Sequence, residues 1–181
     1  MESVDSFPEI CPDYVNVTIP PNIAPLNFMM KDAEKMNVIL EGKGGTITIQ
    51  ASGNKAVISP GKWRNLLQKS VGDSLTIRVS ALEGGTWKEY RPFIWHVADE
   101  EIDPFLSYRL IEPGYEVWSR ISISERDLTG FRERKLADNN LIDDGCVNCH
   151  ICLQQDPSRS FFFFFFPGGG RWYNRRGSSG R

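Results

Sequence analysis

Histidine and cysteine are scarce in this chain of 181 residues, which contains two histidines and four cysteines. The G-x-S-x-G and H-E-x-x-H strings of common hydrolases do not occur, and two histidines give little material for a catalytic triad. Gly42 and Lys43 predict a turn rather than a phosphate loop, because position 37 is Asn where that loop has its first glycine. We therefore expect a protein that is not an enzyme.

Long apolar runs are also missing. No stretch approaches the roughly 18 to 20 apolar residues that a membrane-spanning helix needs, so we expect no transmembrane segment in this chain. Residues 1–8 show no basic region followed by an apolar one, and no export signal is visible.

Charge is unevenly distributed along the chain. From Pro157 onward there are five arginines and no acidic residue, which leaves 16 basic and 23 acidic residues before that point. The chain before Pro157 is therefore acidic and lacks the positively charged surface that binds phosphates. For this reason we expect no nucleic-acid partner.

Short strands separated by turns dominate the first hundred residues. Prolines make residues 1–14 an extended lead-in, and residues 15–100 predict one domain. Glycine-rich breaks separate the expected strands, which are 13–19, 38–40, 46–50, 56–58, 74–81 and 87–97. This spacing predicts a mainly β fold: a small antiparallel sandwich of immunoglobulin or fibronectin type III style.

One short helix is expected inside this domain. Within residues 60–69, Trp63, Leu66 and Leu67 have the i, i+3, i+4 spacing of an apolar helical stripe. In the last expected strand, Phe93 and Trp95 share one face, and His96 falls on the opposite face. We expect the two aromatic residues to lie in the core.

The remainder of the chain has a different composition. Residues 101–159 mix aromatic residues with charges and turn signals and predict an irregular segment, with the charged stretch 124–134 at the surface. Residues 160–181 contain six consecutive phenylalanines and an arginine, glycine and serine mixture. This composition predicts a low-complexity tail that is disordered or that results from a shifted reading frame.

The string Cys146-Val147-Asn148-Cys149-His150 is a C-x-x-C-H motif within the expected irregular segment. This spacing is typical of covalent c-type haem, in which two thiols form thioether bonds and the histidine binds the iron. Cys146 and Cys149 are therefore the candidate cofactor-binding residues, and His150 is the candidate metal ligand. The second axial ligand would come from His96, from a methionine or from water; the candidate methionines are Met29, Met30 and Met36.

Zinc is the main competing interpretation of the same residues. Cys152 follows two positions after His150, and Cys11 supplies a fourth thiol. Structural zinc sites usually combine two well-separated ligand pairs, and here the ligands crowd into seven positions. A redox pair or unoccupied cysteines remain alternatives.

Three stretches together resemble a known family: residues 14–28, residues 108–118 and the C-x-x-C-H string. Over about residues 8–159 the chain is similar to the N-terminal region of TolB-like envelope proteins labelled cytochrome c biosynthesis proteins. The resemblance implies a periplasmic or outer-membrane-associated location and a β-propeller after the motif. The absence of that propeller here fits a truncated chain.

Two functions follow as hypotheses. The first is a c-type haem-binding protein of the cell envelope that transfers electrons or senses redox state with a redox partner protein. The second is a non-catalytic extracytoplasmic binding or scaffold module, which would contact an envelope protein and whose cysteines are unoccupied or bind zinc.

Overall fold

The structure is a computed structural model of the whole chain. It describes the backbone of residues 1–110, 121–138, 146–153, 156–166 and 169–176, and the side chains of the first two ranges. The fold is mainly β, with 52% strand and 7% helix over residues 1–110 and 121–138, and its sheets are antiparallel or mixed. The predicted fold class with one short helix is confirmed at this level, while the immunoglobulin likeness stays a prediction.

The chain divides into two compact units, Met1–Asp103 and Pro104–Arg181. The first unit contains one helix and ten strands, which are β1 (Glu2–Val4), β2 (Ile10–Cys11), β3 (Val17–Ile19), β4 (Phe28–Met30), β5 (Lys35–Gly42), β6 (Gly45–Ala51), β7 (Lys55–Ala56), α1 (Pro60–Gln68), β8 (Ser74–Glu83), β9 (Thr86–Tyr90) and β10 (Phe93–Val97). Residues 1–14, expected as a lead-in, belong to this unit and carry its first two strands.

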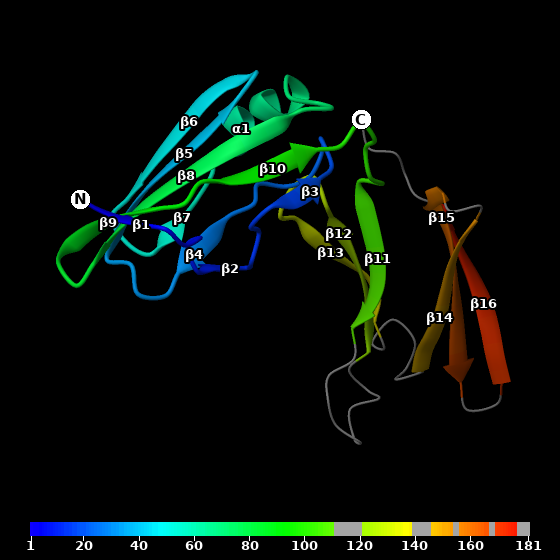
Figure 1. Cartoon of the computed structure of the whole chain (residues 1–181). Helices are drawn as coiled ribbons and strands as arrows, with labels where there is room; N and C mark the ends of the chain where they lie inside the picture. Colours follow the sequence, from blue (N-terminus) through cyan, green and yellow to red (C-terminus); the bar gives the residue numbers. More distant parts are fainter. Residues whose placement is uncertain (111–120, 139–145, 154–155, 167–168, 177–181) are drawn as a thin grey trace. The chain divides into compact units, whose positions relative to one another are not determined.

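A seven-stranded sheet forms most of the first unit (Figure 1). Strand β8 is central: β5 pairs along one side of it, and β9 and β10 pair with opposite ends of its other side. The sheet is mixed rather than purely antiparallel, because β1 pairs with β9 and β3 pairs with β10 in parallel. These two parallel strands come from the proline-containing N-terminal segment, which returns to cover the edge of the sheet.

The sharpest hairpin joins β8 to β9. Its two central residues, Gly84 and Gly85, have φ values of 55° and 78°. Two positive φ values in a two-residue loop are those of a type I′ turn, whose twist matches the flanking strands. The strand expected over 87–97 is divided into β9 and β10, because Pro92 has no N–H to donate to the ladder.

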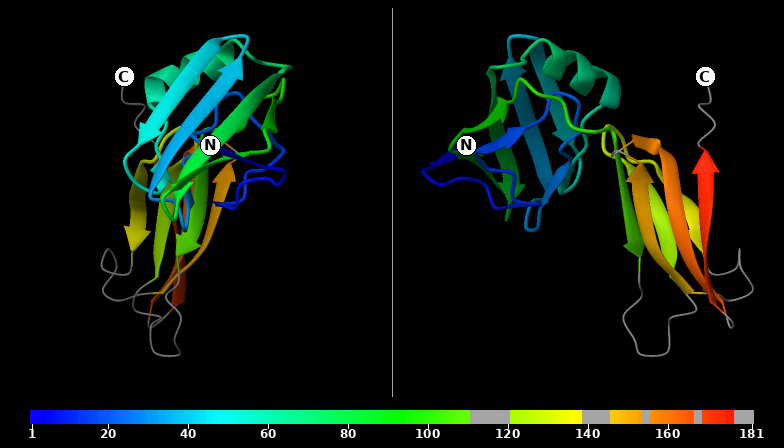
Figure 2. Two further views of the ribbon diagram at one scale, coloured as in Figure 1. Left: turned by 60° about the vertical axis from the view of Figure 1, so that its left-hand side comes forward. Right: turned by 90° about the vertical axis from the view of Figure 1, so that its right-hand side faces the viewer.

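A second, smaller sheet completes the first unit. Its order is β2-β4-β7, and both pairings are antiparallel. Apolar residues of both sheets and of α1 form one core, which includes Phe28, Met36, Leu40, Val79 and Trp95. Figure 2 shows α1 beside the large sheet. The predicted helical stripe is confirmed, because Trp63, Leu66 and Leu67 are buried.

Two tryptophans anchor the core to the N-terminal segment. The Nε1 of Trp95 donates to the carbonyl of Tyr14 over 2.7 Å, and the Nε1 of Trp63 donates to the carbonyl of Ile23 over 2.9 Å. Their rings meet edge to face, with centroids 5.8 Å apart. Each indole therefore buries its apolar surface while its polar group is satisfied by a carbonyl of the irregular N-terminal chain.

The turn between β5 and β6 packs tightly against α1. A Cβ at Gly44 would lie 2.9 Å from the carbonyl oxygen of Leu66 and 3.1 Å from the Cβ of Lys69. The first of these neighbours is helix backbone, which cannot move without displacing α1. Glycine at this position allows the hairpin to approach the helix.

We expect Gly44→Ala to destabilise the protein by about 1–3 kcal/mol, the usual cost of inserting an extra methyl group into a packed contact. Gly53→Ala is the matched control, because a Cβ at Gly53 meets nothing within 4 Å. Urea titrations followed by circular dichroism would compare the two. Equal stability of both variants would contradict the packing between the turn and the helix.

A hydrogen-bonded acid lies at the end of the β8–β9 hairpin. Glu83 accepts from the hydroxyl of Tyr90 over 2.6 Å and from the Nζ of Lys88 over 2.9 Å. The Tyr90 hydroxyl, and then Lys88, hold the pKa of Glu83 below its usual value. Burial, and then Glu83, raise the pKa of Tyr90.

Replacing Tyr90 with phenylalanine is expected to cost about 1.5–3 kcal/mol at neutral pH, the range for a hydrogen bond to a charged group. The pKa of Glu83 is lower in the folded protein than in the unfolded chain. The ionised carboxylate therefore stabilises the fold at pH values above its unfolded pKa, and this stabilisation is lost as pH falls through its folded pKa. The difference in unfolding free energy between wild type and Tyr90→Phe should therefore shrink as pH falls through this acidic range.

Urea titrations at neutral and successively lower pH would measure that difference. The same substitution in a Glu83→Gln background is the control, and there its cost should not change with pH. If Tyr90→Phe lowers the unfolding free energy of the otherwise wild-type protein equally at every pH, that result would contradict the assigned hydrogen bond.

The second unit begins with an antiparallel sheet of three strands, β11 (Phe105–Leu110), β12 (Ser122–Asp127) and β13 (Glu133–Asp138). This sheet occupies part of the range 101–159, which we expected to be irregular. Alternation in β12 is difficult to recognise from the sequence, because residues on both of its faces are buried and two of the buried residues, Glu125 and Asp127, are charged.

Two acids in this sheet are buried, although their charged stretch was predicted to lie at the surface. Glu125 is 4% exposed and accepts from the Nε of Arg134, its register partner on β13, over 2.7 Å. Asp127 is 7% exposed and accepts from the backbone and hydroxyl of Thr129. Its hydrogen bond with the Thr129 hydroxyl holds the pKa of Asp127 below its usual value. Each acid is therefore buried together with a hydrogen-bonding partner.

Candidate cofactor site

The C-x-x-C-H motif lies on a strand of a second three-stranded sheet in the same unit. This sheet contains β14 (Cys146–Leu153), β15 (Asp156–Phe166) and β16 (Gly169–Arg176), with antiparallel pairing throughout. Strand β15 contains the six phenylalanines, so the stretch expected as a disordered tail has paired backbone in the structure (Figure 1). Residues 139–145, which precede the motif within the segment expected to be irregular, lie outside the described residues.

A register shift falls inside the motif. Cys146 pairs with Phe165 and Cys149 pairs with Phe163, and the register shifts between Val147 and Cys149, where Asn148 has no partner in the ladder. Such an extra residue on one strand is a β-bulge. Positions three apart lie on opposite faces of a regular strand. Because of the bulge, the partners of the two cysteines on β15 are Phe165 and Phe163, which are two positions apart and therefore on one face. The two cysteine positions thus lie on one face of the sheet.

His150 occupies a different register position. It pairs with Phe162, the neighbour of the Cys149 partner on β15. Adjacent positions of a ladder alternate between faces. The backbone therefore places the position of His150 on the face opposite the two cysteine positions.

The two parts of the motif fit haem differently. Two cysteine positions on one face suit two thioether bonds to the edge of a single porphyrin, as c-type attachment requires. Axial ligation also requires the imidazole to reach the iron of that porphyrin, and the His150 position in the β14 ladder does not fit this requirement. The cysteine pair thus fits the cofactor, and the histidine fits it only in another backbone conformation.

The candidates for a second axial ligand all belong to the first unit. His96 is exposed on β10, on the face opposite Trp95 as predicted, and its Nδ1 lies 2.8 Å from the Ser74 hydroxyl. Met30 and Met36 are 4% and 1% exposed within the core, so neither sulfur reaches a ligand without unfolding that core. Met29 is half-buried on β4.

The zinc interpretation included the thiol of Cys11. This residue is a free, exposed cysteine on β2 of the first unit, where it pairs with Met29. Among the residues whose side chains the structure describes, no three His, Cys, Asp or Glu residues gather into a group able to hold a metal ion. The motif residues 146–150 are not among them, so the assignment of Cys146, Cys149 and His150 stays a prediction.

No family model matches the sequence, and no curated protein is significantly similar to it. Over the described part of the chain, no helix is both long enough and apolar enough to cross a membrane.

Proposed function

We propose that this chain belongs to a cell-envelope protein that holds c-type haem through Cys146 and Cys149 and uses it in electron transfer or redox sensing. The observation that carries the proposal is the C-x-x-C-H string, supported by a register that sets both cysteine positions on one face of β14. Bound haem supplies an iron that exchanges one electron with a redox partner protein. The resemblance to TolB-like envelope proteins supports the location.

In this proposal His150 is the proximal ligand of the haem iron. Its register position lies on the face opposite the cysteines, so ligation requires the end of β14 to leave the ladder beyond Cys149. The bulge at Asn148 is where the ladder is already interrupted, because one residue there has no partner. Haem attachment and a local change in the pairing of β14 with β15 are therefore linked.

The paired ladder favours a second candidate function. With β14 bonded to β15 from Cys146 to Leu153, the motif is part of a sheet rather than of a cofactor pocket. This arrangement suits a non-catalytic extracytoplasmic binding module of a TolB-like protein, whose cysteines are unoccupied or bind zinc and whose partner is an envelope protein.

The metal content of the purified protein separates the two candidates. The chain would be fused to an export leader and produced together with a c-haem maturation system. We expect about one iron per chain by elemental analysis and the α-band of reduced c-type haem in the visible spectrum. Stoichiometric zinc, or no metal, with no α-band would contradict the haem proposal and support the binding module.

A further inference from the structure

Strand β6 forms a free edge of the large sheet. It pairs with β5 from Gly45 to Ala51, and no other described strand pairs with it (Figures 1 and 2). Along this edge, every second residue directs its backbone N–H and C=O groups away from the sheet. An unpaired edge of this kind is a template for another strand.

This edge lacks the features by which proteins usually block edge pairing. Its sequence, Gly-Thr-Ile-Thr-Ile-Gln-Ala, contains no charged residue and no proline, and its pairing with β5 has no bulge. The other outer strands of the first unit differ: β1 begins with Glu2, β2 is followed by Pro12, β3 is followed by Pro20 and Pro21, and β7 carries Lys55. Charges, prolines and short length are the usual protection, and β6 has none of them.

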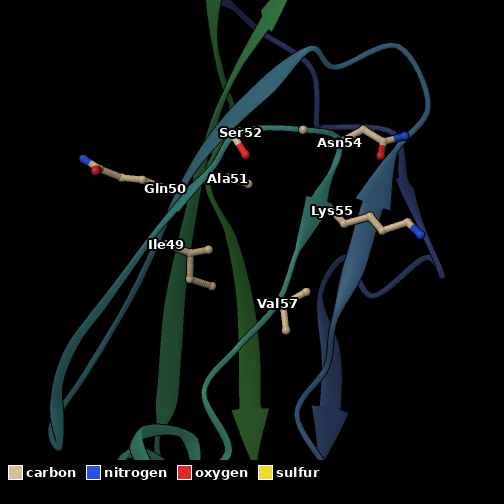
Figure 3. A pocket seen from close by; sticks show the side chains of 8 residues that line it. Ile49, Gln50, Ala51, Ser52, Asn54, Lys55 and Val57 are labelled. Carbon is tan, nitrogen blue, oxygen red and sulfur yellow. The ribbon is translucent and has the colours of Figure 1, made fainter.

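A groove of about 410 Å³ lies beside the second half of this edge. Ile49 and Ala51 line it from β6, and Val57 lines it from the segment after β7 (Figure 3). Val57 is 64% exposed. A strand added along β6 would therefore gain backbone hydrogen bonds and also a partly apolar groove for its inward side chains.

The strand is complementary to itself. In an antiparallel pairing centred on Thr48, the residue Ile47 of one copy lies opposite Ile49 of the other, and Thr46 lies opposite Gln50. The isoleucines then meet on one face of the sheet and the polar residues meet on the other, while Gly45 lies opposite Ala51. No like charges meet, because the strand carries no charge, and this complementarity selects a second copy of the chain as the occupant.

We propose that two copies of this chain form a two-fold symmetric dimer through antiparallel pairing of their β6 strands. Each copy places Ile47 beside Ile49 of the other copy, next to the groove. Few residues contribute, so the interface is small and the dimer exchanges with monomer in a concentration-dependent equilibrium. The pairing joins the two seven-stranded sheets into one.

The two-fold axis provides a sharp test at Thr48, which would face its own copy about 4.5–5.5 Å away between Cβ atoms. Thr48→Lys or Thr48→Glu alone would put like charges opposite each other and should leave the protein monomeric. An equal mixture of the two variants puts opposite charges there and should restore the dimer. Thr18→Lys is the matched control, because Thr18 is an exposed threonine on β3, another outer strand of the sheet.

Analytical ultracentrifugation of the full chain over a concentration series would measure the mass of each species, and circular dichroism would confirm that every variant is folded. Wild type and Thr18→Lys should approach twice the monomer mass, as should the equal mixture of Thr48→Lys with Thr48→Glu. Wild-type protein that stays monomeric into the millimolar range would overturn the proposal. The β6 edge would then be a binding site for an extended peptide of another protein. Dimers of Thr48→Lys alone, or a monomeric mixture, would also overturn the proposal.

Discussion

Replacing Trp95 with alanine is expected to remove about 3–5 kcal/mol of stability, the usual cost of deleting a large aromatic side chain from a core. Trp95 is 0% exposed, and its ring contacts those of both Trp63 and Phe93 edge to face. The substitution also leaves the Tyr14 carbonyl without its 2.7 Å hydrogen bond. Because natural domains have only about 5–15 kcal/mol of folding stability in total, this loss should remove a large fraction of the stability of the first unit.

Urea and thermal denaturation followed by far-ultraviolet circular dichroism would test this expectation without depending on tryptophan fluorescence. Trp87→Ala is the matched control, since this tryptophan is 37% exposed on β9 and should cost much less. Trp95→Phe should fall between them, because it keeps an aromatic ring but removes the N–H donor. Similar costs for Trp95→Ala and Trp87→Ala would show that the core is not organised around Trp95.

Replacing both Cys146 and Cys149 with alanine is expected to abolish covalent haem completely. No thiol then remains in the motif to form a thioether bond. Either single substitution leaves one thiol and should give a lower yield of attached haem. The measurement is haem-dependent staining of the chain after electrophoresis under denaturing conditions.

Cys152→Ala is the control for this pair, because Cys152 lies on the same strand but outside the C-x-x-C-H spacing. It should attach haem as the wild type does. If Cys152→Ala lost as much attached haem as the double variant, the C-x-x-C spacing would not be what selects the attachment site. Staining of the double variant equal to that of wild type would mean that haem is bound elsewhere or not covalently.

Local signals in the sequence predicted much of the first unit. The apolar stripe of α1, the glycine turns on either side of β6 and the shared face of Phe93 and Trp95 all depend on residues close in the sequence. The division at Pro92 also has a local cause that the sequence contains. Periodicity and turn residues are therefore sufficient where an element is long or its turn is tight.

Long-range pairing was harder to predict. The parallel pairings of β1 with β9 and of β3 with β10 join the N-terminal segment to strands far along the chain, and nothing in the spacing of its prolines specifies those partners. In the second unit, Glu125 resembles a surface residue until the β12–β13 register places Arg134 opposite it. A buried charge is recognisable only together with its partner.

The motif shows the same limit at the candidate site. Its residue types and spacing are visible in the sequence and predict haem chemistry, but the bulge at Asn148 is not visible there. In a regular strand the two cysteine positions would fall on opposite faces, and the bulge is what brings them to one face. The strand partner, supplied by the phenylalanine run, determines that register.

The central claim is that Cys146 and Cys149 hold haem covalently. The most direct measurement is the mass of the exported chain, produced with a c-haem maturation system, under denaturing conditions, followed by sequencing of the peptide that contains residues 146–150. The account predicts one haem mass added to that peptide, with neither cysteine available to an alkylating reagent. An unmodified mass with both thiols fully alkylated would contradict it.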